Sequence, residues 1–213
     1  NPTELSLFCQ TLKSSVQKAV EQKDETASAV GFDVEYCTLE LDIRNGLPAM
    51  IQLASPIKGG SVGLIWIDKF PNQGKDMLTD PKCKPLMELL SDYRVRKVGM
   101  SASKDARNLA AWWGFKDKQD IDHLFAGIVD LEEQEDERVR DKNLQQACED
   151  TLALSLLKVK QRISKKQKKR KRQARGTKTA HWRTDDLTKE MKKYAADDVA
   201  CGVDIWMKLN GLK

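Results

Sequence analysis

The sequence lacks the features that mark disulfide-rich and zinc-binding proteins. It has two histidines and five cysteines, no two of which form a Cys-x-x-Cys pair. A disulfide framework or a thiolate zinc site needs paired or closely spaced cysteines, so we expect reduced thiols in an intracellular compartment. Two histidines give little support to a histidine-rich metal site. The cysteines are Cys9, Cys37, Cys83, Cys148 and Cys201.

Long hydrophobic runs are also missing. The longest stretch that is nearly free of charge, Asn45 to Ile67, contains Lys58 and the prolines Pro48 and Pro56. A membrane-spanning helix needs about 18 unbroken apolar residues, so this stretch favours two strands and a turn. No basic-then-apolar leader is visible at the start of the chain. We therefore expect neither a membrane protein nor a secreted one.

The overall composition is that of a soluble globular protein. Of the 213 residues, 40% are hydrophobic and 32% are charged. This length suits one domain with its own core and is short for two. No internal repeat is present, so we expect a single domain over residues 1–213.

Charge is distributed unevenly along the chain. The segment from Lys158 to Lys178, here called the basic strip, holds twelve Lys and Arg residues and no acid, while the rest has 25 basic and 32 acidic residues. Such a strip attracts polyanions with salt-sensitive affinity. Nucleic-acid contact and a nuclear-import signal both remain open, and the second favours the nucleus over the cytoplasm. The candidate nucleic-acid contacts are Lys165, Lys166, Lys168, Lys169, Arg170, Lys171 and Arg172.

Hydrophobic periodicity predicts an α/β domain built on a mixed sheet. An amphipathic helix opens the chain, three strands follow, and a strand, a helix and a short strand come next. The rest is expected to be helical, apart from the basic strip and a solvated acidic stretch from Asp130 to Asp141. Ser101 or Ser103 is the expected cap of the helix that ends at Trp113. Expected strands are 29–43, 49–54, 62–67, 96–100 and 120–124, and expected helices begin at 4, 86, 101 or 103, 143 and 187.

A few acids fall at the ends of predicted elements. Asp33 and Glu35 are two apart on a strand, so they leave the same face. Tyr194 and Asp198 are four apart on the last helix and also share a face. Asp105 lies in the first turn of the helix after the fourth strand. If the four carboxylates converge, they form a hard-oxygen site suited to Mg²⁺ or Mn²⁺. The alternative is that Asp33 is simply exposed at a strand end.

These residues also match three motifs in order. The run Gly31-Phe-Asp-Val-Glu35 resembles the first motif of the DEDD 3′–5′ exonucleases. Val98-Gly99 followed by Asp105 is similar to the second, and Tyr194-Ala-Ala-Asp-Asp198 to the third in its tyrosine variant. The histidine variant needs a histidine where Lys193 stands. The motif sequences are most similar to those of the ribonuclease D and Werner-protein exonuclease branch. That branch also has a tryptophan before the tyrosine, which corresponds to Trp182 in this sequence.

The resemblance covers roughly Leu5 to Leu209, with the basic strip as an insertion before the last helix. It implies a ribonuclease-H-like fold: a mixed β-sheet flanked by helices. The implied activity is two-metal hydrolysis of RNA or single-stranded DNA from the 3′ end, releasing nucleoside 5′-monophosphates.

The resemblance also implies a role for each motif residue. Asp33 would bridge two Mg²⁺ or Mn²⁺ ions, Glu35 and Asp198 would hold one ion, and Asp105 the other. Tyr194 would keep its phenol proton, because a phenol has a pKa near 10, and its hydroxyl would position the attacking water.

Other residues allow two interpretations each. Tyr36 could stack on the terminal base or be an ordinary strand tyrosine. Asn108 could brace Asp105 or reach the substrate strand, and His181 could touch substrate. Trp112 and Trp113 fit the core better than a binding surface.

A catalytically silent nucleic-acid-binding or adaptor protein on the same fold is the alternative function. Because all four acids and Tyr194 are present, the sequence favours the enzyme. Nothing in it indicates an oligomeric state or a protein partner.

Overall fold

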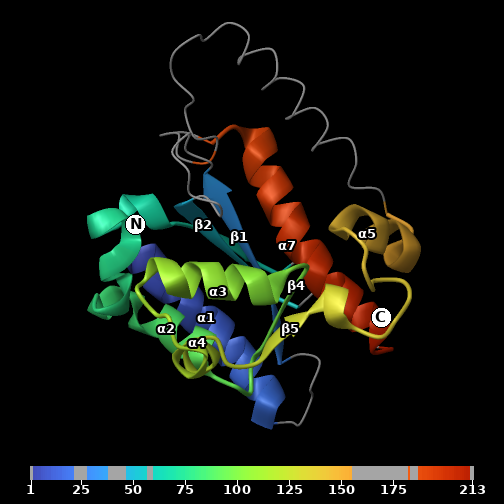
Figure 1. Ribbon diagram of the computed structural model, residues 1–213, viewed down its shortest axis with the longest axis horizontal. Coiled ribbons are helices and arrows are strands. Elements are labelled where there is room, and N and C mark those ends of the chain that lie inside the picture. The colour runs from blue at the N-terminus through green and yellow to red at the C-terminus, as the bar shows by residue number, and fades with distance from the viewer. Residues whose placement is uncertain are drawn as a thin grey trace, which may run out of the picture.

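The computed structural model describes residues 2–21, 28–37, 47–56, 60–154, 182 and 187–211. Its centre is a five-stranded sheet in the order β3-β2-β1-β4-β5. The first three strands are antiparallel neighbours, whereas β4 and β5 run parallel to β1 (Figure 1). This mixed sheet flanked by helices confirms the predicted fold class. The strands are β1 (Ala29–Cys37), β2 (Leu47–Ala54), β3 (Val62–Trp66), β4 (Arg96–Gly99) and β5 (Ile128–Asp130).

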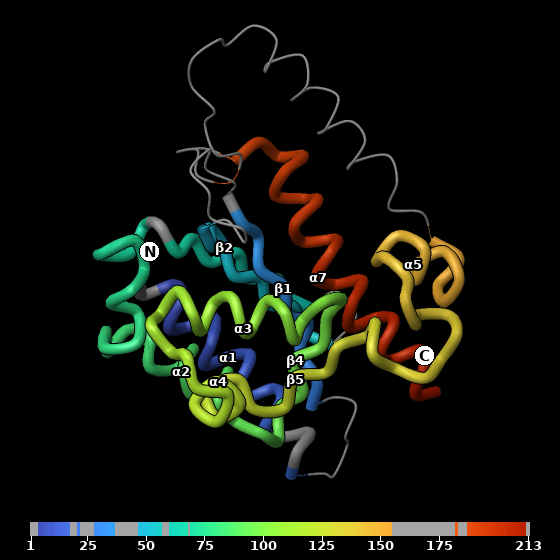
Figure 2. Tube along the Cα trace, viewed as in Figure 1, coloured from blue at the N-terminus to red at the C-terminus, as the bar shows by residue number. Residues whose placement is uncertain are grey.

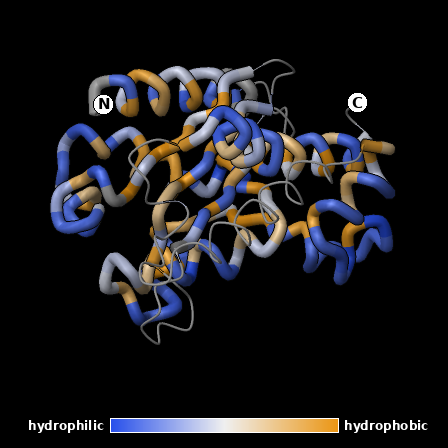
Figure 3. The backbone as a smooth tube through the Cα atoms, turned by 90° about the horizontal axis from the view of Figure 1, so that it is seen from above, coloured by the Kyte–Doolittle hydropathy of each residue, from blue (hydrophilic) through white to orange (hydrophobic). Residues whose placement is uncertain are grey.

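Helices cover both faces of the sheet. The core on one face joins β1 and β2 to α1, α2 and α3, and the core on the other face includes α5 and α7. Figure 3 shows hydrophobic stretches towards the middle of the molecule and hydrophilic ones on its outer segments. The helices are α1 (Pro2–Glu21), α2 (Lys84–Ser91), α3 (Ala102–Trp112), α4 (Lys118–Leu124), α5 (Leu144–Leu152) and α7 (Lys189–Leu209).

Successive side chains of β1 point to opposite faces of the sheet, which explains why the two faces of this strand differ. Phe32 and Val34 are 1% and 5% exposed and join the core with α1, α2 and α3. Asp33 lies between them in sequence and therefore projects to the opposite face, the one that α7 covers. The chain thus places acids on the α7 face of a strand whose other face is apolar.

The predicted strand at residues 120–124 is wrong. These residues belong to α4, because the Asp117 side chain caps its start by accepting a hydrogen bond from the Gln119 N–H at 2.9 Å. Ile121 and Leu124, three apart, then pack as partly buried residues against the core. The fifth strand lies further along the chain, at Ile128–Asp130.

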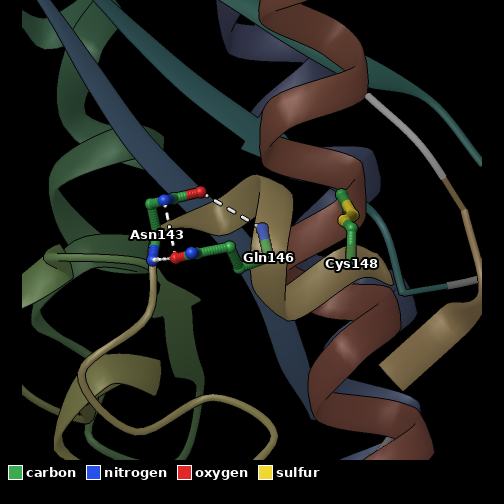
Figure 4. The surroundings of a disulfide bond; sticks show 4 residues. Asn143, Gln146 and Cys148 are labelled. Carbon is green, nitrogen blue, oxygen red and sulfur yellow. Dashed lines mark hydrogen bonds between the residues drawn. A yellow bond between two sulfur atoms is a disulfide. The ribbon is translucent and has the colours of Figure 1, made fainter. Parts of the chain in front are cut away.

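Two other helix predictions need correction. The helix expected over 143–159 ends at Leu152, because Ala153 takes a left-handed conformation with φ 53°. Asn143 and Gln146 cap its start reciprocally (Figure 4). Ser101 occupies the predicted N-cap position of α3 but makes no side-chain cap there.

The expectation of reduced cysteines is wrong for one pair. Cys148 on α5 and Cys201 on α7 form a disulfide, with Cα atoms 6.8 Å apart (Figure 4). The two positions are 53 residues apart in sequence, so their spacing gave no sign of the contact. Cys9 and Cys83 are buried free thiols, and burial raises the pKa of Cys83 to about 11.

The search for membrane spans gave a negative result over the described part of the chain. None of the helices there combines the length and the apolar character needed to cross a bilayer.

Candidate active site

A close contact between α7 and β1 sets the position of the last helix. A Cβ on Gly31 would lie 2.4 Å from the Val199 carbonyl oxygen, so the helix can approach only because residue 31 is glycine. Further along, a Cβ on Gly202 would lie 3.5 Å from the Cα of Gly99 on β4. The Cα trace shows α7 running diagonally over these strands (Figure 2). Asp198 directly precedes Val199 and is thereby brought to the face of β1 that carries Asp33.

Tyr194 lies one helical turn before Asp198 and is 8% exposed. Its phenol shares a hydrogen bond with the Asp198 carboxylate, and the charges of Glu35 and Asp33 also act on it. Burial is the largest cause that raises the pKa of Tyr194, followed by the charge of Asp198. The phenol therefore keeps its proton at neutral pH and donates it in this hydrogen bond.

The Tyr194 ring is held by packing from outside α7. Trp182 stacks on it with ring centroids 6.2 Å apart and an angle of 28° between the ring planes. Met50 on β2 and Met191 belong to the same buried cluster. The helix itself begins where the Thr188 side chain accepts a hydrogen bond from the Met191 N–H at 3.2 Å.

Asp105 reaches β1 from the first turn of α3. Pairing between β1 and β4 ends at Gly31 and Val98, so within the described part of the chain no strand pairs with the next residues of β1 on that side. The Asp105 carboxyl fills this place: it accepts a hydrogen bond from the Val34 N–H and shares one with the Asp33 carboxyl. Burial and then the charge of Asp33 raise the pKa of Asp105. Two carboxyls this close need a shared proton or a cation between them.

Tyr36 and Asn108 also lie beside Asp105. The Tyr36 hydroxyl donates to the Asp105 carbonyl oxygen at 3.1 Å and is hydrogen-bonded to the Asn108 side chain. Burial is the main cause that raises the pKa of Tyr36, so this hydroxyl remains a donor. The structure thus brings together Asp33, Glu35, Tyr36, Asp105, Asn108, Tyr194 and Asp198.

The donors of the site are carboxylate oxygens, which fit Mg²⁺ or Mn²⁺ better than zinc. Among the described residues, no three His, Cys, Asp or Glu side chains are gathered closely enough to enclose an ion. The acids instead meet pairwise, with Asp33 hydrogen-bonded to Asp105 and with Asp198 bound to Tyr194. The donor type thus fits a divalent cation, while among the described residues the acids form pairs rather than one enclosing cluster.

Other candidates lie elsewhere. Trp113 is 8% exposed and its indole N–H donates to the Gly74 carbonyl oxygen at 3.0 Å, while the Trp112 indole reaches the Gln73 carbonyl oxygen at 3.3 Å. Both therefore hold the turn at residues 73–74. His181 lies outside the described residues, as does the basic strip with Lys165, Lys166, Lys168, Lys169, Arg170, Lys171 and Arg172.

Sequence reasoning missed Asp130. It was assigned to a solvated acidic stretch, but it is 6% exposed and its carboxylate accepts hydrogen bonds from the start of α3. The one available signal was its place directly after the apolar residues Ile128 and Val129, where an unpaired acid would be unfavourable.

Comparisons with known proteins bear on the family and the fold. A family model described as "3′-5′ exonuclease" matches residues 9–212. No curated protein matches the sequence. Trypanosoma brucei RNase D is similar in structure, with a TM-score of 0.61 and 19% identity over 96% of this chain and 63% of that one. This chain therefore spans less than two thirds of that relative.

Two further solved structures share the fold. T. brucei RNase D in complex with RNA U12 has a TM-score of 0.60 and 20% identity, covering 99% of this chain and 67% of that one. Brucella melitensis NrnC bound to pGG has a TM-score of 0.53 and 18% identity, covering 87% of this chain and 72% of that one.

Proposed function

The chain belongs to the 3′–5′ exonuclease family, and on this premise we propose that it hydrolyses RNA or single-stranded DNA from the 3′ end, releasing nucleoside 5′-monophosphates. One observation carries the proposal. The Asp33–Asp105 carboxyl pair and the Tyr194–Asp198 pair, from β1, α3 and α7, meet beside the middle of β1, where the charge of Asp33 acts on both Asp105 and Tyr194. Acids are rarely brought together in this way unless they hold a cation.

The proposed cofactors are two divalent cations, Mg²⁺ or Mn²⁺. When bound, they would offset the negative charge of the phosphodiester and of the attacking and leaving oxygens. Asp33 occupies the centre of the arrangement, since its charge acts on both Asp105 and Tyr194. We assign it to bridge the two ions, with Glu35 and Asp198 as ligands of one and Asp105 as a ligand of the other.

Tyr194 is proposed to position the attacking water, as in the tyrosine variant of the family. Its raised pKa means that the phenol donates a hydrogen bond and cannot remove a proton at neutral pH. The stacked Trp182 ring and the bond to Asp198 fix its hydroxyl. A fixed donor can orient a water towards phosphorus without changing its own protonation state.

The substrate is proposed to be a single strand with a free 3′ end. RNase D in complex with RNA U12 and NrnC bound to pGG are similar folds that hold RNA or a nucleotide ligand, which supports a nucleic-acid substrate. The basic strip adds the charge that a polyanion requires. We propose that it contacts the substrate beyond the cleaved nucleotide. Its similarity to an import signal favours the nucleus over the cytoplasm.

The test is a gel assay with 5′-labelled single-stranded RNA and DNA of one sequence. Each is incubated with Mg²⁺, Mn²⁺ or EDTA, beside the Asp33→Ala variant. We expect a descending ladder that requires metal and disappears in the variant, and the faster strand identifies the substrate. Retarded but intact strands would instead support a silent nucleic-acid-binding protein and refute the enzyme.

The basic strip is tested separately by deleting residues 165–175. Loss of a substrate contact should reduce turnover and flatten its salt dependence. An import signal alone would leave both unchanged in vitro.

A further inference from the structure

Asp130 is a buried acid that the proposed chemistry does not use. It ends β5, and its carboxylate is surrounded by backbone N–H donors. The Ser101 N–H donates to Oδ1 at 3.0 Å, the Ser103 N–H to Oδ2 at 3.0 Å and the Glu132 N–H to Oδ1 at 3.2 Å. Two of the three donors belong to the turn that begins α3, the helix of Asp105.

The conformation of this turn is unfavourable without a partner. Ser101 has φ 57° and ψ 23°, a left-handed geometry that is unfavourable for a residue other than glycine. Its hydroxyl donates to Glu132 Oε1 at 2.8 Å, so it does not cap the helix. Asp130 supplies the cap instead, as an anion at the positive end of α3.

Ser101 connects this cap to the catalytic acid. Its N–H is held by Asp130, and its carbonyl oxygen accepts from the Asp105 N–H at 3.1 Å. A single residue therefore lies between the Asp130 carboxylate and the backbone of Asp105. On the other side, Asp105 is held by β1, through the Tyr36 hydroxyl on its carbonyl and the Val34 N–H on its carboxyl.

We propose that Asp130 is a positioning residue for the nuclease reaction. Its carboxylate fixes the Ser101 turn, and the turn fixes where the Asp105 carboxyl stands relative to Asp33. The catalytic consequence rests on the proposed function, whereas the structural effect does not. Two strands thus fix the position of Asp105: β1 contacts it directly, and β5 acts through Asp130 and Ser101.

The test compares Asp130→Asn with Asp117→Asn. Asparagine places an NH₂ group where one oxygen accepted, which leaves at least one N–H of the α3 turn unpaired. Asp117 is a matched control because it caps α4 through the Gln119 N–H, and no residue of the candidate site lies on α4. The readouts are kcat, KM, the Mn²⁺ concentration for half-maximal activity, and hydrogen exchange at residues 101–105.

For Asp130→Asn we expect kcat to fall about 10- to 100-fold and the half-saturating Mn²⁺ concentration to rise, with a smaller change in KM. Exchange of the Ser103 and Asp105 amides should accelerate. Asp117→Asn keeps a side-chain oxygen for the Gln119 N–H, so it should leave exchange at residues 101–105 and kcat at their wild-type values.

Loss of stability is separated from loss of position by Ser101→Gly in the Asp130→Asn background. Glycine removes the cost of the left-handed conformation, so the double variant should regain stability but not kcat. Full recovery of kcat would overturn the proposal, as would wild-type kcat and Mn²⁺ dependence in folded Asp130→Asn. If wild type shows no metal-dependent degradation, the proposed function fails. The exchange measurement then tests the structural role of Asp130 alone. Unchanged exchange at residues 101–105 in Asp130→Asn would refute that role.

Discussion

The Asp105 carboxyl on α3 is hydrogen-bonded to the Asp33 carboxyl on β1, inside a site where Asp105 is only 8% exposed. Two acids in this position repel when both are ionised, and the charge of Asp33 contributes to the raised pKa of Asp105. The protein keeps this repulsion although replacing one acid would relieve it. The pair therefore supports the proposed role of both acids in binding a cation.

Replacing Asp105 should separate stability from activity. Asp105→Asn keeps an oxygen for the Val34 N–H and removes a carboxyl whose pKa is raised by burial and by the charge of Asp33. We expect the free energy of unfolding in EDTA to stay equal or rise, by on the order of 1 kcal/mol, while metal-dependent cleavage is lost. Chemical denaturation and the gel assay on the same preparation measure both. A stable variant with wild-type activity would remove Asp105 from the site.

Gly31 should be intolerant of a side chain. In Gly31→Ala the new methyl group meets the Val199 carbonyl oxygen at 2.4 Å, which forces α7 away from β1. Because Tyr194 and Asp198 move with α7, activity should fall together with stability. Gly114→Ala is the control: its φ is +97°, but nothing lies within 4 Å of the added Cβ. That variant should lose about 1 kcal/mol and remain active, and equal effects of the two would contradict the account.

Lys97 should make stability depend on pH. Burial lowers its pKa to about 7, and its Nζ donates to the Asp92 carbonyl oxygen at 2.9 Å. The unfolded chain, with a lysine pKa near 10.4, binds more protons above pH 7 than the folded protein does. Stability therefore rises with pH in this range.

Relative to Lys97→Met, the wild-type free energy of unfolding should increase by about 2 kcal/mol from pH 7 to pH 9. Denaturation of both proteins at the two pH values gives this difference, and parallel pH profiles would show that Lys97 has an ordinary pKa.

The disulfide should contribute to stability through the loop it closes. Cys148 and Cys201 are 53 residues apart in sequence. In the chain-entropy treatment, a disulfide that closes a loop of that length stabilises the folded protein by about 4 kcal/mol. Adding a reductant should lower the free energy of unfolding by a comparable amount. The Cys148→Ala/Cys201→Ala double variant should show no response to reductant. A response there would assign the effect to another pair of cysteines.

Much of the fold could be predicted because its signals are local. The alternation of Phe32, Asp33 and Val34 gave the strand and its two faces, and the order of the motifs gave the positions of the acids. The strand predicted at 120–124 is wrong because Ile121 and Leu124, three apart, share a face only on a helix, which the Asp117 cap begins.

The remaining failures concern contacts between distant parts of the chain. The disulfide joins two helices, and the Asp130 cap joins the end of β5 to the start of α3. The disulfide leaves no pattern in the sequence near its cysteines, and the place of Asp130 after Ile128 and Val129 indicates a paired acid without indicating its partner. The Asp33–Asp105 hydrogen bond is also of this kind, and only the motif resemblance indicated that these two acids would meet.

The neighbouring acids Asp197 and Asp198 on α7 offer the most direct test of the central claim. Asp198 is bound to Tyr194 at the site, whereas Asp197 pairs with Lys193 on the helix surface, with Nζ 2.7 Å from Oδ2. The measurement is the rate of nucleoside 5′-monophosphate release from single-stranded RNA and DNA in Mn²⁺ by Asp198→Asn, Asp197→Asn and wild type. The account predicts that the release rate of Asp198→Asn is at least about 100-fold below that of wild type, and that the rate of Asp197→Asn equals that of wild type. Equal rates for the two variants would contradict it.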